Sequence, residues 1–128
     1  MHQGITLASI IEREASTPED RSRVAQVFYR RISEGRRLQS DATALYGAAL
    51  NGAEPSAHYE SAYNTYSHDG LPPGPISNVS ASSLAAVANP ASTDYLYFVA
   101  GDDGQTYFSH TLAEHEALTQ QHCTRACQ

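Results

Sequence analysis

Hydrophobic residues near the start of the chain recur at the spacing of an amphipathic helix. At about 100° per residue, Leu7, Ile10, Ile11 and Glu14 fall on one stripe of a helix predicted over residues 7–15. Glu14 therefore occupies the centre of an apolar face, where a leucine would be the ordinary residue.

The remaining pattern predicts four further helices and one β-hairpin. Thr17, with Pro18 after it, suits the N-cap of the second helix, and Gly35 suits its end. Asp102-Asp103-Gly104 suits the turn of the hairpin. The predicted helices cover residues 18–34, 43–50, 81–89 and 111–121, and the predicted strands cover 94–100 and 105–109. These elements indicate an α+β fold, mainly helical, with a small antiparallel β-hairpin.

Residues 51–80 show no clear periodicity, and a long irregular segment in a small domain is usually functional or disordered. Aromatic and proline residues argue against disorder here: Tyr59, Tyr63, Tyr66 and the run Gly70-Leu71-Pro72-Pro73-Gly74-Pro75. The segment is either a loop that binds a ligand such as a sugar through its aromatic faces or a structural loop that covers the core.

Composition and charge narrow the class of protein. The chain has 128 residues and 41% hydrophobic content, which fits one compact domain. A formal net charge of −6 argues against a nucleic-acid partner. The basic cluster lies around the end of the second helix, where it more often complements the helix dipole than binds a polyanion: Arg30, Arg31, Arg36 and Arg37. No apolar run approaches the ~18 residues that cross a bilayer.

The two cysteines, Cys123 and Cys127, are able to pair, bind metal or remain inert. Their helical i, i+4 spacing near a chain end favours the inert interpretation. No zinc-binding motif is present, although several residues have ligand chemistry: His58, His68, Asp69, His110 and His115. No metal and no cofactor are expected.

Glu14 is the candidate for chemistry, and Glu12 is expected to project away from the apolar face. A carboxyl group held against apolar surface has a raised pKa, and a carboxylic acid that stays protonated near neutral pH is suited to general-acid catalysis. The alternative is a structural glutamate paired to an arginine or to backbone amides. Glycoside cleavage normally uses a second carboxylate, for which the candidates are Asp41, Glu60 and Asp69.

From residue 7 to about residue 115, the chain resembles the catalytic domain of the YceG-like (MltG-type) endolytic murein transglycosylases. Six motifs in order carry the resemblance: Leu7-Ala8-Ser9-Ile10-Ile11-Glu12-Arg13-Glu14, Arg37-Leu38-Gln39-Ser40-Asp41, Tyr63-Asn64-Thr65-Tyr66, Gly70-Leu71-Pro72-Pro73-Gly74-Pro75-Ile76, Asn89-Pro90-Ala91 and Tyr95-Leu96-Tyr97-Phe98-Val99. In the first motif, the family's catalytic acid falls on Glu14. Ala42 departs from the family, in which a proline is frequent at this position.

The resemblance implies a lysozyme-like helical core and a bacterial enzyme that cuts nascent peptidoglycan strands. The bond is the β-1,4 link between N-acetylmuramic acid and N-acetylglucosamine, and the product carries a 1,6-anhydro-muramyl end. One glutamate serves as acid and then as base, because the sugar's own C6 hydroxyl is the nucleophile.

The resemblance also implies an organisation. Residues 1–128 are expected to be a single catalytic domain whose membrane helix and preceding domain lie outside this sequence. The full-length protein is expected at the extracytoplasmic face of the cytoplasmic membrane, working alongside peptidoglycan synthases, and the fragment itself is expected to be soluble.

Five further residues are candidates for substrate contact. Gln39 and Asp41 are placed to orient Glu14 or hold substrate, Asn64 to bind an N-acetyl group, and Tyr63 or Tyr66 to stack on a sugar. Each has a structural alternative: an amide that braces a loop, a tyrosine in the core, or, for Asp41, a helix cap.

Two other functions stay open from the sequence. One is a hydrolytic muramidase, with water activated by Asp41, Glu60 or Asp69. The other is a glycan-binding or scaffolding domain without turnover.

Overall fold

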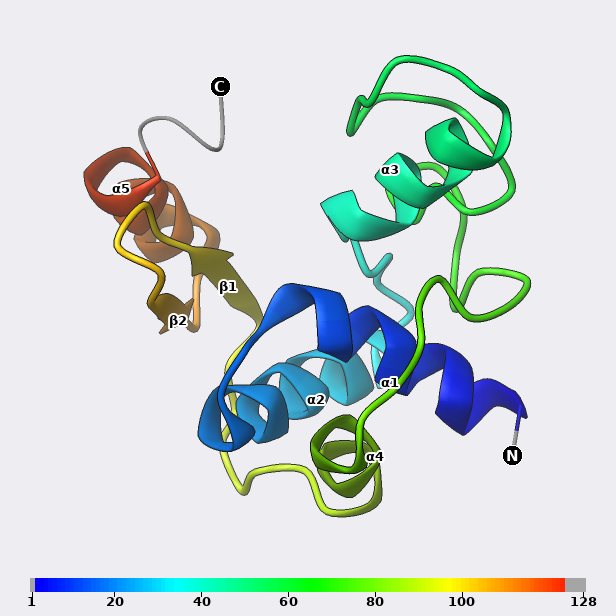
Figure 1. Ribbon diagram of the computed structural model, residues 1–128. Helices are drawn as coiled ribbons and strands as arrows, with labels where there is room; N and C mark the ends of the chain where they lie inside the picture. The colour runs from blue at the N-terminus through cyan, green and yellow to red at the C-terminus, as the bar shows by residue number, and fades with distance from the viewer. Residues whose placement is uncertain (1, 124–128) are drawn as a thin grey trace.

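The computed structural model describes residues 2–123, which form five helices and one two-stranded sheet (Figure 1). The elements, in chain order, are α1 (His2–Glu14), α2 (Pro18–Ser33), α3 (Asp41–Leu50), α4 (Ala81–Ala88), β1 (Tyr97–Ala100), β2 (Thr106–Ser109) and α5 (Leu112–His122). The predicted α+β class is confirmed. None of the helices within residues 2–123 is long and apolar enough to cross a membrane.

Side chains cap the starts of three helices, and for α2 the cap is the predicted Thr17. Thr17 and Ser80 accept hydrogen bonds from backbone amides in the first turns of α2 and α4. Thr111 and Glu114 form a capping box at the start of α5. Gly35, with φ of 71°, follows the end of α2 in a conformation that costs glycine little. Local sequence signals therefore determine where these helices begin and end.

The first strand is shorter than predicted, because residues 94–96 bind α2 with their backbone groups. The Gln26 amide donates to Tyr95 O at 3.0 Å and accepts from Tyr95 N at 3.0 Å. Arg31 Nε donates to Leu96 O at 2.9 Å. Regular pairing with β2 then runs from Tyr97 opposite Ser109 to Ala100 opposite Thr106.

The hydrophobic core lies where α1, α2 and α4 pack together (Figure 1). Ile10 and Ile11 of α1 and Phe28 of α2 are fully buried within it. Phe98 of β1 packs edge-on against Phe28, with ring centroids 5.6 Å apart. The stripe that predicted α1 is thus the face by which this helix enters the core.

Two smaller groups of elements lie on opposite sides of this core in Figure 1: α3 with residues 51–80, and the hairpin with α5. Arg31 links the core to the hairpin. It is only 6% exposed, and its guanidinium carbon lies 4.9 Å from the centre of the Tyr97 ring. Its Nη1 also donates to Arg37 O at 2.8 Å, which fixes the segment that leads into α3. The sequence predicts that Arg31 belongs to a basic cluster that complements the end of the second helix, and the structure buries it against backbone carbonyl groups of Leu96 and Arg37.

Glu12 joins the C-terminal end of α1 to α2 and α4. Its carboxylate accepts hydrogen bonds from Ser80 N at 2.9 Å and Ser83 Oγ at 2.7 Å, and it pairs with Arg21 Nη2 at 3.2 Å. These donors favour the charged form and lower the pKa of Glu12 to about 2. Glu12 does leave the apolar face, as expected, but it meets the start of α4 rather than open solvent.

Cys123 is disulfide-bonded, so the expectation of an inert cysteine is wrong there. The expectation assumed helical spacing, but α5 ends at His122 and Cys123 is its C-cap, with φ of −120° and ψ of 66°. Cys127 lies outside the described residues.

Glu12→Gln is expected to destabilise the fold by about 1–2 kcal/mol at pH 7, because it removes a charged acceptor from three partly buried donors. The pKa of Glu12 is lowered in the folded state, so its contribution is present above the unfolded value of about 4.5 and is lost as pH falls towards about 2. Urea unfolding of the unchanged protein and of Glu12→Gln between pH 7 and pH 2 measures this loss. Glu54→Gln, at an exposed position, is the control. Equal stabilities across that range would contradict the prediction.

Candidate active site

Glu14 is the last residue of α1 and points toward the start of α3. Its Oε1 accepts a 2.6 Å hydrogen bond from the Ser40 hydroxyl. Within residues 2–123, no ion pair joins Glu14 to an arginine, unlike Glu12 two residues earlier. The two glutamates of one motif therefore lie in contrasting environments.

Burial is the main influence on the Glu14 carboxyl group, and it raises the pKa above the ordinary value for glutamate. The negative charge of Asp41 raises the pKa further. The Ser40 hydroxyl and the backbone amide of Ala42 act in the opposite direction, because they bind the charged form. The net effect keeps the proton on Glu14 to a higher pH than on a surface glutamate, as a general acid requires.

Asp41 and Tyr66 form a pair beside Glu14. The Tyr66 hydroxyl donates a short hydrogen bond to Asp41 Oδ1. Burial and this bond raise the pKa of Tyr66, so the phenol stays protonated and continues to donate. Tyr66 is nevertheless 40% exposed, which leaves part of its ring available to a ligand. The interpretation of Asp41 as a helix cap is wrong, because Ser40 is the N-cap residue and Asp41 is the first residue of α3.

Gln39 lies at the surface immediately before Ser40. Its φ of 56° is a left-handed value that is uncommon for a residue with a side chain. Its backbone amide donates to Thr65 O at 3.2 Å, which helps hold this conformation. Backbone strain of this kind is concentrated at functional sites. Gln39 therefore shapes the chain at the site.

Asn64 and Tyr63 are both engaged within the fold. Asn64 is 4% exposed, and its side chain donates to Tyr59 O and accepts from Tyr66 N, each at 2.8 Å. The Tyr63 ring packs against the core and meets Tyr46 edge-on at 5.0 Å. These contacts correspond to the structural alternative for each residue, and they hold the loop that presents Tyr66.

The other candidate carboxylates are occupied away from Glu14. Glu60 accepts from Ser67 at 2.6 Å and pairs with His68 at 3.4 Å, and Asp69 pairs with Arg37 at 2.9 Å. Across residues 2–123, no three His, Cys, Asp or Glu side chains lie close enough together to hold a metal ion.

Sequence reasoning missed Ser40, which is 3% exposed and directly contacts Glu14. The available signal was its place beside Asp41 at the start of a helix, but that signal equally describes an ordinary cap.

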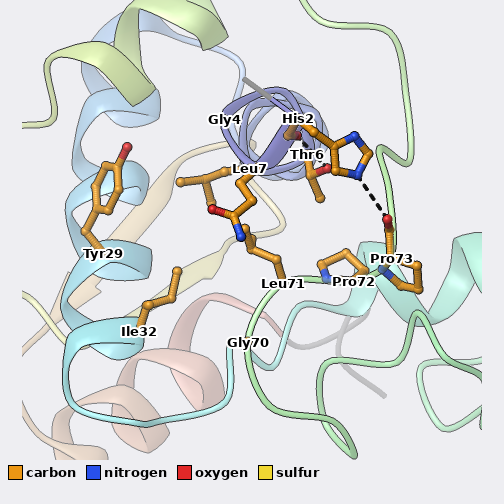
Figure 2. A pocket seen from close by; sticks show the side chains of 11 residues that line it. His2, Gly4, Thr6, Leu7, Tyr29, Ile32, Gly70, Leu71, Pro72 and Pro73 are labelled. Carbon is orange, nitrogen blue, oxygen red and sulfur yellow. Dashed lines mark hydrogen bonds between the residues drawn. The ribbon is translucent and has the colours of Figure 1, made fainter.

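The proline-rich run borders a hollow at the other end of α1 (Figure 2). The hollow has a volume of about 660 Å³ and lies between the first half of α1, the second half of α2 and residues 70–73. Leu7, Ile32 and Leu71 contribute apolar side chains, and His2 bonds Pro73 O at 3.1 Å. Glu14 does not line this hollow.

Comparison with known proteins assigns the family. Residues 1–121 match the YceG-like family. The chain belongs to that family. It is 43% identical over 118 residues to an endolytic murein transglycosylase of Bacillus subtilis (strain 168), covering 90% of this chain and 33% of that protein. It is 34% identical over 127 residues to an endolytic murein transglycosylase of Streptococcus pneumoniae serotype 2, covering 92% of this chain and 23% of that protein.

A crystal structure of a yceG-like protein from Listeria monocytogenes has the same fold. The TM-score is 0.82 at 46% sequence identity, over 91% of this chain and 39% of that one. The present chain thus spans a quarter to two-fifths of the length of these YceG-like relatives.

The two glutamates of the YceG-like motif are expected to titrate far apart. Glu14 should lose its proton above the ordinary glutamate range, whereas Glu12 should stay charged down to about pH 2, in line with its lowered pKa. Carbon-detected NMR of the carboxyl groups across a pH series measures both titrations. Two curves that coincide with each other would contradict the described environments.

The two tyrosines of the 63–66 motif are expected to differ in their effect on stability. Tyr63→Ala should lower the free energy of unfolding by about 2–3 kcal/mol, because it removes a ring packed on the core. Tyr66→Ala should cost about 1 kcal/mol, mainly through the lost hydrogen bond to Asp41. Chemical denaturation of both variants gives the order, and a larger loss for Tyr66→Ala would reverse these assignments.

Proposed function

We propose that this domain cleaves peptidoglycan glycan strands as an endolytic lytic transglycosylase. The observation that carries the proposal is a carboxyl group with a raised pKa at Glu14, in a chain whose relatives bear that enzyme name. The bond is the β-1,4 link between N-acetylmuramic acid and N-acetylglucosamine, and the product ends in a 1,6-anhydro-muramyl sugar.

One carboxyl group is sufficient for this chemistry. The Glu14 proton passes to the bridging oxygen as the bond from that oxygen to the anomeric carbon breaks. The C6 hydroxyl of the same muramyl sugar then bonds to the anomeric carbon, and its proton returns to Glu14. No water is consumed, and the carboxyl group ends the cycle protonated as it began.

Asp41 and Tyr66 support the charged stages of the reaction. Positive charge develops at the anomeric carbon as the bond breaks, and the carboxylate of Asp41 beside Glu14 offers a compensating negative charge. The exposed part of the Tyr66 ring offers a face for a sugar. Gln39 lies at the surface of the same site, while Asn64 and Tyr63 act through the loop that holds Tyr66.

The proposed setting is the extracytoplasmic face of the bacterial cytoplasmic membrane. There, an anchor and a further domain outside this sequence would bring residues 1–128 to nascent strands beside peptidoglycan synthases. The relatives are three to four times longer than the part that this chain matches, which leaves room for such segments in the relatives.

Hydrolysis is the second candidate, because Asp41 places a second carboxylate beside Glu14. A muramidase would activate water there and leave a reducing end instead of an anhydro end. A binding domain without turnover would leave the strands intact.

Glu14→Gln is expected to abolish strand cleavage, with a loss of at least about 100-fold, because the amide keeps the shape but has no proton to transfer. The variant should remain folded. The raised pKa of Glu14 means that its stabilising contribution falls as pH rises past the ordinary glutamate value, so replacing the carboxyl costs little at neutral pH.

Incubation of purified strands with each variant, followed by mass spectrometry of the products, tests the proposal. Anhydro ends are lighter than reducing ends by one water molecule, so the masses separate transglycosylation from hydrolysis. Glu54→Gln is the matched control for activity. Undiminished cleavage by Glu14→Gln would remove the catalytic role of Glu14, and reducing ends alone would establish the muramidase.

A further inference from the structure

We propose that Ser40 is a positioning residue that holds one oxygen of Glu14 and leaves the other oxygen to carry the transferable proton. The proposal rests on the proposed function of Glu14 as the acid. The hydroxyl of Ser40 donates to Glu14 Oε1 at 2.6 Å, and the serine is almost completely buried. An oxygen that accepts this bond is the carbonyl-like oxygen of the acid, so the proton belongs on Oε2.

Ser40 gives up an ordinary structural role to make this contact. It is the N-cap of α3, and a serine at this position usually binds a backbone amide of the first turn. Thr17, Ser80 and Thr111 all make such bonds at the starts of their helices, whereas the Ser40 side chain makes none. A capping bond is worth about 1 kcal/mol. At α3 the backbone amide of Ala42, in the first turn, instead interacts with the Glu14 carboxyl group, so the Ser40 hydroxyl is left to bind Glu14 as well.

The backbone of Ser40 is fixed by a closed ring of hydrogen bonds. Its N–H donates to Thr65 Oγ1 at 2.9 Å, and its carbonyl accepts from Thr43 Oγ1 at 2.7 Å. The two threonine hydroxyls lie 2.8 Å apart. Because the single hydroxyl proton of Thr43 goes to Ser40 O, the proton between the threonines comes from Thr65. All three residues are buried, so Ser40 has little freedom to move.

Neighbouring residues of the chain add to this constraint. Gln39, directly before Ser40, is held in its left-handed conformation by Thr65 O. Asp41, directly after it, is held by Tyr66. The position of the Ser40 hydroxyl is therefore set from the 63–66 motif on one side and from α3 on the other. This arrangement is rigid enough to orient a catalytic group.

Ser40 and Asp41 act on Glu14 in opposite directions, which makes the role of Ser40 measurable. The serine bond favours the charged form of Glu14, and the aspartate charge favours the protonated form. Removing the Ser40 hydroxyl should therefore raise the pKa of Glu14, and neutralising Asp41 should lower it. If Ser40 had only a packing role, its removal would not shift the pKa of Glu14 in the direction opposite to the shift caused by neutralising Asp41.

The experiment compares Ser40→Ala with Asp41→Asn by carboxyl NMR titration of Glu14 and by the pH dependence of strand cleavage. In Ser40→Ala, the titration midpoint of Glu14 and the basic limb of the pH profile of kcat/KM should both move to higher pH. The value of kcat should fall roughly tenfold or more, because the acid loses its orientation. In Asp41→Asn, the Glu14 titration midpoint and the basic limb of kcat/KM should both move to lower pH. Thr111→Ala, which removes a cap bond at the start of α5, should lower stability and shift neither the Glu14 titration nor the pH profile.

Two further variants keep the test decisive. Ser40→Gly also lacks the hydroxyl and suits an N-cap, so it replaces Ser40→Ala if the latter does not fold. Ser40→Thr restores a hydroxyl and should recover part of kcat. An unchanged Glu14 titration in Ser40→Ala or Ser40→Gly would overturn the proposal. The titration is read without substrate, so activity retained by Glu14→Gln would refute the proposed function and leave this measurement interpretable.

Discussion

A carboxyl group removed from water must either keep its proton or find donors that replace the lost solvation. At the C-terminal end of α1, Glu12 and Glu14 show these two outcomes two residues apart. Glu12 finds Ser80, Ser83 and Arg21 and is held charged. Glu14 is half-buried with fewer donors and a negative neighbour, so it favours the neutral acid. The contrast depends on α1 being fixed in the core, since the two glutamates lie about 200° apart around the helix and therefore face different neighbours.

Each part of the fold therefore helps to hold the next part in position. The core of α1, α2 and α4 fixes the direction of Glu14, and the Glu12 contacts fix the end of the same helix. Arg31 ties the hairpin and the segment before α3 to that core through two backbone carbonyl groups. The 63–66 loop then positions Ser40 through its backbone and Asp41 through Tyr66. Elements distant in the sequence meet at a single carboxyl group.

Much of this could be predicted from the sequence, because helical spacing, caps and turns are local signals. The apolar stripe of α1 identified Glu14 as unusual, and Thr17 marked the start of α2 correctly. The contact between Ser40 and Glu14 spans 26 residues, and no spacing rule encodes it. Nothing in the sequence marks Arg31 as a buried link, because its acceptors are backbone carbonyl groups, which every sequence supplies. Asp41 was read as a cap because serine and aspartate are equally good caps.

The left-handed turn at Gln39 has a consequence for engineering. A glycine there would relax the backbone, because glycine adopts a positive φ at little cost, although it would also add conformational freedom to the unfolded chain. The same change would loosen the peptide that precedes Ser40 and widen the range of angles from which its hydroxyl approaches α1. Relief of backbone strain and precise placement of the Ser40 hydroxyl are therefore opposed at this one residue.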